Sequence, residues 1–246
     1  STSVSCTWAS TCSRCGTSVA LSTVLRTLVG AGGALITESP TYFGMIAIAK
    51  LAGVKTIPVP TDEEGIRVDL LEQALNRSRA KVIYLQPTYG NPTGVCLSSE
   101  RRARVLELAA QKNAFIIEDD YARDLGTGAP PAPMARNGEG RVIYVRSLTK
   151  TGAPGLRVAA IVAFGPVLAR LRGARAIDDF FVAGLMQAVA AELVSSPGYA
   201  LHLRRLSTEL AVRRRAALDA IARHLPEAVV RHLPTGGFSL WVELPA

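Results

Sequence analysis

Short apolar segments that alternate with helical patterns constrain the fold of this chain more than any other feature. The apolar segments lie at residues 33–38, 54–59, 81–87, 114–120, 141–147 and 157–164. Apolar residues occupy both odd and even positions in them, which predicts strands that are buried on both faces. Most are separated by helical patterns, at residues 17–30, 42–53, 68–76 and 98–113. The sequence therefore predicts an α/β fold, with a mainly parallel sheet flanked by helices.

The pattern changes after residue 165. Two long helical stretches, at residues 167–195 and 199–224, precede two strand-like segments around the pair Gly236 and Gly237. This order predicts an incomplete small α+β domain at residues 198–246. It follows a large domain at residues 16–197 and an irregular N-terminal segment at residues 1–15. Because a single hairpin packs poorly alone, we expect a truncated C-terminus.

The composition is that of a soluble globular protein, since 48% of the 246 residues are hydrophobic and 20% are charged. No apolar run reaches the roughly 18 residues of a transmembrane helix, so we expect no contact with a membrane. The first residues lack the pattern of a signal peptide, which predicts a cytoplasmic protein. The net charge of +8 fits solvated helix faces better than a nucleic-acid site, because basic and aromatic residues are not interleaved.

Cys12 and Cys15 form an isolated C-x-x-C motif. A zinc site would need a second pair or nearby histidines, and His202, His224 and His232 all lie far along the chain. A redox motif would need a strand before it, and the sequence offers none. We therefore expect no metal at this motif.

Polar side chains follow the predicted strands, where a parallel sheet binds its ligands. Because the carboxyl ends of the strands share one edge of the sheet, these side chains should converge on one crevice. In chain order they are Tyr42, Asn91, Asp119, Asp120, Tyr121, Ser147, Thr149, Lys150 and Arg157.

Lys150 taken alone is most simply a surface lysine. Its place just past a buried strand allows the partial desolvation that a Schiff-base lysine needs. Ser147, Thr149 and Arg157 together would fit a phosphate group. The four residues therefore predict a ligand that carries both an aldehyde and a phosphate.

Asp119 and Asp120 point to opposite sides of an extended chain, so one of them can face the crevice. A carboxylate there could hold a cationic ring nitrogen. Tyr121 and Asn91 could hydrogen-bond a phenolate oxygen, and Tyr42 could lie on the face of a ring. A ligand with all of these groups is pyridoxal 5′-phosphate.

The order P-x-Y, N-P-T-G, D-x-Y and S-x-x-K, with an arginine after the lysine, resembles fold-type I, PLP-dependent aminotransferases of class I/II. The resemblance implies that Lys150 is the Schiff-base lysine and proton shuttle in the transamination of an amino acid. It implies that Asp119 is the partner of the pyridine nitrogen and that the Asn91–Pro92 bond is cis. It also implies phosphate contacts from backbone N–H groups of Gly16, Thr17 and Ser18 at the start of the first helix.

One branch of that family resembles this chain more closely. "EDDYARD", "DDFFVAG" and "LVSSP" are similar to the aminotransferase-like domain of MocR-type regulators in the GntR group. Those proteins sense an amine or a B6 vitamer, and they bind DNA through a winged helix-turn-helix domain that this chain lacks. The resemblance also implies a homodimer.

Three hypotheses remain open from the sequence. The first is an aminotransferase, the second an effector-sensing domain of a regulator, and the third a truncated chain that does not fold stably. The family binds the substrate carboxylate with an arginine late in the small domain. Because the chain ends before that position, we expect weak or no transamination by this polypeptide.

Overall fold

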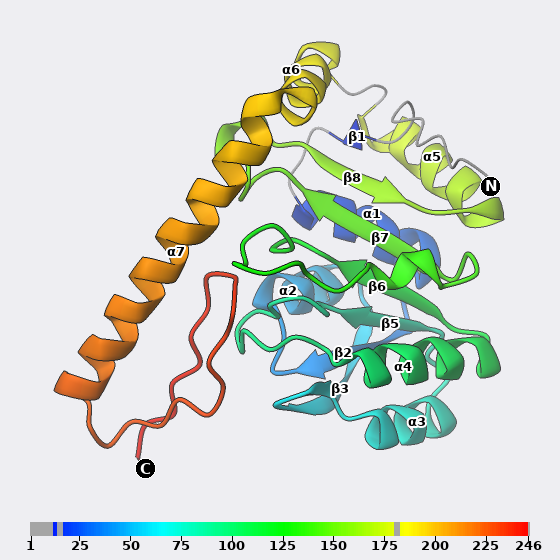
Figure 1. Ribbon diagram of the computed structural model, residues 1–246. Helices are drawn as coiled ribbons and strands as arrows, with labels where there is room; N and C mark the ends of the chain where they lie inside the picture. Colours follow the sequence, from blue (N-terminus) through cyan, green and yellow to red (C-terminus); the bar gives the residue numbers. More distant parts are fainter. Residues whose placement is uncertain (1–11, 14–16, 180–182, 246) are drawn as a thin grey trace.

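The apolar segments form the strands of one eight-stranded sheet in the computed structural model, which describes residues 12–13, 17–179 and 183–245 (Figure 1). The strands are β1 Cys12–Ser13, β2 Ala34–Ser39, β3 Lys55–Asp62, β4 Gly65–Ile66, β5 Val82–Leu85, β6 Phe115–Asp119, β7 Val142–Ser147 and β8 Ala159–Val162. Their order across the sheet is β1-β8-β7-β6-β5-β2-β3-β4. The five central strands, β7 to β3 in that order, run parallel, whereas β1, β8 and β4 pair antiparallel at the edges. The predicted mainly parallel sheet is confirmed.

Helices follow most of the strands, as the helical patterns predict. They are α1 Thr17–Leu28, α2 Phe43–Leu51, α3 Val68–Arg77, α4 Ser99–Gln111, α5 Gly165–Asp179, α6 Gly184–Ser195 and α7 Pro197–His224, with 3-10 turns η1 Met134–Arg136 and η2 Pro154–Leu156. The first turn of α4 shows how local residues start a helix. The Ser98 hydroxyl caps it by accepting a hydrogen bond from the Arg101 N–H at 3.4 Å.

Two apolar cores lie on opposite faces of the sheet. One contains residues of α1, α2 and α5, and the other contains residues of α3, α4 and η1. Successive strand residues divide between them: Ile117 joins the first core and Ile116 the second. This alternation of side chains fixes which face each residue at the end of a strand can reach.

Three elements differ from the sequence-based expectation. The stretch at residues 167–195, expected as one helix, is two, because Ala183 has the non-helical angles φ −58° and ψ 112°. Residues 12–13, placed in the irregular N-terminal segment, pair with β8 as a short edge strand.

The expected C-terminal hairpin is the third difference. Among the described residues, one pair is formed across it, Val229 with Glu243, through two backbone hydrogen bonds of 2.9 Å. The segment between them turns to the loop after β6, where the Gly237 N–H donates to the Leu125 carbonyl at 3.1 Å. A two-stranded ribbon without a third strand is marginal, so contacts with the loop after β6 prevail.

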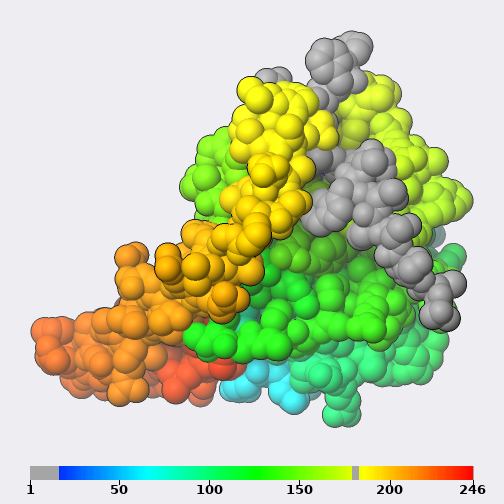
Figure 2. All heavy atoms as spheres, turned by 45° about the horizontal axis from the view of Figure 1, so that its top comes forward, coloured from blue at the N-terminus to red at the C-terminus, as the bar shows by residue number. Residues whose placement is uncertain are grey.

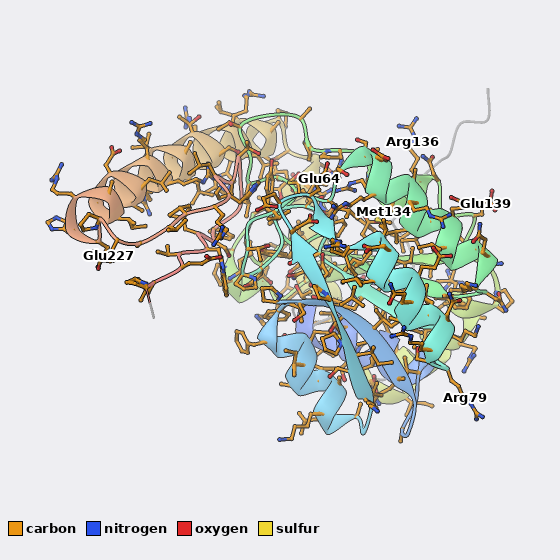
Figure 3. All side chains as sticks on the ribbon, turned by 90° about the horizontal axis from the view of Figure 1, so that it is seen from below. Glu64, Arg79, Met134, Arg136, Glu139 and Glu227 are labelled. Atoms are coloured by element: carbon orange, nitrogen blue, oxygen red, sulfur yellow. The ribbon has the colours of Figure 1, made fainter. Side chains whose placement is uncertain are left out.

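Helix α7 contacts the loop after β7 at its N-terminal end and leads into this C-terminal segment. At its start, the Tyr199 hydroxyl donates to Thr151 Oγ1 at 2.9 Å and His202 Nε2 lies 2.9 Å from the Thr151 carbonyl oxygen. The helix then projects from the body as an arm, with residues 225–245 beside its far half (Figures 1 and 2). Glu227, just past its end, lies on the opposite side of the molecule from Glu139 (Figure 3).

No helix in the described ranges has the length and apolar character needed to cross a bilayer.

Arg102 on α4 fastens the loop that follows β5. Its guanidinium is buried and donates to the carbonyl oxygens of Leu97 at 2.9 Å and Pro87 at 2.5 Å. It also donates to Thr88 Oγ1 at 3.1 Å. The conformation of this loop therefore depends on one charged group under it.

Replacing Arg102 by methionine should destabilise the fold by roughly 2–4 kcal/mol, because buried carbonyl groups lose charged donors. Arg104→Met on the same helix is the matched control. Its ion pairs with Glu72 and Glu107 are partly exposed and should contribute much less to stability. Urea unfolding followed by circular dichroism measures both, and equal losses in the two variants would contradict this account of the loop.

Candidate functional site

Asp119 ends β6 as a buried carboxylate with one oxygen free. Its Oδ2 accepts hydrogen bonds from the Tyr84 hydroxyl at 2.7 Å and from Gln86 Nε2 at 2.9 Å. The side chain is 1% exposed, and Oδ1 has no hydrogen-bond partner among the described residues. A buried acceptor of this kind is costly unless a ligand donates to it.

Burial dominates the electrostatics around this carboxylate. It raises the pKa of Asp119 to about 6, against the lowering effect of the Tyr84 and Gln86 hydrogen bonds, and the nearby charge of Asp120 raises it further. Burial likewise raises the pKa of Glu38 to about 7, although the Gln86 N–H lowers it by donating to Glu38 Oε2 at 2.8 Å. Two acids held in this way favour a cationic partner for the free oxygen of Asp119.

Asp120 lies on the other face of the sheet, as the alternation of side chains predicts. Its Oδ2 accepts from the Tyr144 hydroxyl at 2.9 Å and lies 3.3 Å from Arg123 Nη1. Its Oδ1 also has no hydrogen-bond partner in the described part of the chain. Because Arg123 already supplies a cation, Asp119 is the better candidate to hold a positively charged ligand group.

The loop after β5 brings Asn91 toward Asp119 through Gln86. The Asn91 N–H donates to Gln86 Oε1 at 3.0 Å, and the Asn91–Pro92 bond is cis, which confirms that expectation. Tyr121, expected to bind a ring oxygen, uses its hydroxyl proton on the Tyr89 carbonyl at 2.8 Å. It remains able to accept a hydrogen bond at this position.

Tyr42 lies where α1 and α2 begin. Its hydroxyl is 3.5 Å from Ser18 Oγ in the first turn of α1. Its ring covers Gly44 so closely that a Cβ there would lie 2.3 Å from Cζ. Thr17 opens α1, so its backbone N–H belongs to the helix N-terminus, whereas Gly16 lies outside the described residues.

Lys150 follows β7, the strand next to β6. Its side chain is exposed, with Nζ 5.6 Å from the ring centroid of Phe238. Ser147 Oγ donates to Thr149 Oγ1 at 2.9 Å and accepts from the Thr149 N–H at 3.1 Å. The Arg157 side chain is exposed, and its backbone adopts the left-handed conformation, with φ 50°. Within the described ranges no hydrogen bond joins this group to Asp119, and the pairing of β6 and β7 places the ends of their two strands side by side.

Tyr84, Gln86 and Glu38 are functional candidates that the sequence reasoning missed. Burial and the neighbouring Asp119 raise the pKa of Tyr84, so its hydroxyl remains a donor. Tyr84 and Gln86 are two residues apart, which puts them on one face of the β5 path. That spacing is the signal that could have found them.

Metal chemistry has little support in the described part of the chain. It contains no cluster of three or more histidine, cysteine or acidic residues that could hold an ion. The C-x-x-C motif falls partly outside this part, because Cys15 is not among the described residues.

A protonated ring nitrogen would fit the free oxygen of Asp119. Such a group supplies one N–H donor and one positive charge, which are what the buried Oδ1 lacks. The site residues present therefore fit a pyridine-type cofactor.

Comparisons with known proteins point the same way. The model of the family described as aminotransferase class I and II matches residues 9–246. The chain is 33% identical to an uncharacterized HTH-type transcriptional regulator, YdfD, of Bacillus subtilis, over 92% of this chain and 47% of that protein. It is 32% identical to aromatic-amino-acid aminotransferase 1 of Thermococcus litoralis, over 94% of this chain and 57% of that protein.

The fold comparison agrees. LysN, the α-aminoadipate aminotransferase of Thermus thermophilus, was solved with N-(5′-phosphopyridoxyl)-L-leucine and superimposes with a TM-score of 0.88 at 32% identity. The match covers 95% of this chain and 61% of that one, so the chain spans only about half to three fifths of the relatives it matches. On the match to the family model, the chain belongs to the class I and II aminotransferase family.

Proposed function

We propose that this chain binds pyridoxal 5′-phosphate as the cofactor-binding domain of a protein that transfers the amino group of an amino acid. The observation that carries the proposal is the buried Asp119, whose Oδ1 has no partner within the described residues. A pyridinium nitrogen supplies that partner. Membership of the family and the phosphopyridoxyl compound bound to LysN support the same cofactor.

Lys150 and Asp119 have different roles at this site. Lys150 Nζ holds the aldehyde carbon and, once released, moves the proton of the substrate α-carbon. Asp119 would keep the ring nitrogen protonated, because its buried carboxylate would set a negative charge against that nitrogen. Bound there, the cofactor supplies an electron-poor ring that accepts the electron pair left at the α-carbon.

The remaining predicted residues orient the ring and its phosphate. Tyr42 covers the ring face, and Asn91 with Tyr121 holds the ring oxygen. Ser147, Thr149 and Arg157 bind the phosphate, aided by N–H groups of Gly16, Thr17 and Ser18. Support for this arrangement comes from the Ser18 hydroxyl, which lies 3.5 Å from the Tyr42 hydroxyl and so brings the first turn of α1 near Tyr42.

An effector-sensing domain of a MocR/GntR-type regulator is the second candidate. The similarity to the HTH-type regulator YdfD, at 33% identity, favours it. The two functions share the cofactor site and differ in its output. Formation of a 2-oxo acid from an amino acid by the full-length protein would favour the transferase, and effector-dependent DNA binding would favour the regulator.

Pairing with a second copy of the chain is also part of the proposal. Large apolar side chains are exposed on α2 and α6, namely Phe43, Ile46, Leu51, Leu185 and Val189. Several large exposed apolar side chains on one helix are typical of a surface that another protein covers.

Lys150→Ala should abolish covalent attachment of the cofactor. Incubation with pyridoxal phosphate, reduction with borohydride and peptide mass spectrometry should place the phosphopyridoxyl group on Lys150 in the unmodified protein. Lys112→Ala, which removes an amine at the end of α4, should leave that label in place. Equal labelling of the Lys150→Ala protein would show that another amine holds the aldehyde.

Asp119→Asn should weaken cofactor binding by at least about tenfold, because the ring nitrogen loses a buried negative charge. Asp120→Asn is the matched control, since that carboxylate faces Arg123 and Tyr144 on the other side of the sheet. Its effect should stay within about threefold, measured by fluorescence titration. A greater loss in Asp120→Asn would reverse the assignment of the two acids.

A further inference from the structure

Gln86 makes a bridge between two residues that belong to different parts of the chain. It follows the last residue of β5 and is 3% exposed. Its Nε2 donates to Asp119 Oδ2 at 2.9 Å, and its Oε1 accepts from the Asn91 N–H at 3.0 Å. Both ends of one side-chain amide are therefore used, one on each of the two residues.

The chemistry of the two ends admits one orientation of the amide. The Asp119 carboxylate accepts hydrogen bonds, whereas the Asn91 backbone N–H only donates one. If the amide were flipped, its oxygen would face the Asp119 carboxylate and its NH₂ group would face the Asn91 N–H, and neither pair could form a hydrogen bond. To make both hydrogen bonds, the side chain at position 86 must therefore carry a donor and an acceptor on one planar group.

Gln86 is itself held at its backbone. Its N–H donates to the buried Glu38 Oε2 at 2.8 Å, which ties the residue to the end of β2. The loop beyond it has other supports, because Arg102 donates to the Pro87 carbonyl and to Thr88 Oγ1. The loop can thus keep its path without the Gln86 side chain.

We propose that Gln86 is a positioning residue that couples the Asp119 carboxylate to the Asn91 segment and so fixes the spacing between the two partners of one bound heterocycle. The inference rests on the proposed function, in which Asp119 holds the ring nitrogen and Asn91 the ring oxygen. A rigid ring gains affinity when its partners are held at the spacing it needs before it binds.

Two variants separate the two ends of the amide. Gln86→Glu keeps the shape and the acceptor for Asn91 but replaces the donor to Asp119 by an anionic oxygen. Gln86→Met removes both. Gln111→Met on α4 is the matched control, because its amide bonds only to Glu107 at an exposed position.

Two measurements need no cofactor. Hydrogen exchange of the Asn91 amide should become about tenfold faster in Gln86→Met and stay within about twofold in Gln86→Glu. The carbon-13 titration of the Asp119 carboxyl should move to higher pH in both variants, most in Gln86→Glu. The other titratable groups near Asp119 are Tyr84 on β5, Glu38 on β2, Tyr121 and, on the other face of the sheet, Asp120, and all four residues are kept in both variants.

Cofactor affinity is the third measurement. Fluorescence titration with pyridoxal phosphate should show on the order of tenfold weaker binding in both Gln86 variants and no change in Gln111→Met. Unchanged exchange, titration and affinity in the Gln86 variants would overturn the proposal. Should Gln86→Met fail to fold, the Asp119 titration of Gln86→Glu decides alone.

The two proposals fail in different ways. If the unmodified protein takes up no pyridoxal phosphate while exchange and titration shift as expected, the cofactor assignment is wrong and the coupling through Gln86 stands. If the unmodified protein binds the cofactor and the Gln86 variants match it in all three measurements, the cofactor assignment stands and the coupling is wrong.

Discussion

One buried carboxylate at the end of β6 organises the candidate site. Asp119 is held by a tyrosine and a glutamine from the neighbouring β5, so its position depends on the parallel pairing of these two strands. That pairing in turn depends on apolar residues that alternate between two cores. The same alternation separates Asp119 from Asp120 and gives each acid different partners. The chemistry of the site is therefore a consequence of strand register.

The sequence predicted the elements whose causes are local. Apolar residues on both parities indicated the parallel strands, and the adjacency of Asp119 and Asp120 in an extended chain indicated opposite directions for their side chains. Both depend on residues close together in the chain, where periodicity carries the information. The cis bond before Pro92 was predicted from the resemblance to the aminotransferases.

The features that were missed depend on contacts between distant segments. Gln86 contacts Asp119 across 33 positions, and the Gln86 N–H contacts Glu38 across 48. The period-two spacing places Tyr84 and Gln86 on one face of the strand, but it does not record which distant residues they contact. The C-terminal segment does not form a regular hairpin for the same reason, since the Gly237 N–H donates to the Leu125 carbonyl in the loop after β6 instead of to a partner strand. Contacts between distant segments determine the conformation of these residues, so a three-dimensional structure is needed to find them.

Burial of the acids also links the site to the stability of the fold. The pKa of Asp119 is about 6 in the folded chain, against an ordinary value near 3.8, so the folded state binds the proton more tightly. Stability therefore falls as pH rises from the ordinary value through about 6, because the folded protein must then hold a buried charge. A cation against Oδ1 stabilises that charge and lowers the folded pKa. Binding of a protonated ring nitrogen should consequently stabilise the fold most above pH about 6, where the buried charge is otherwise uncompensated.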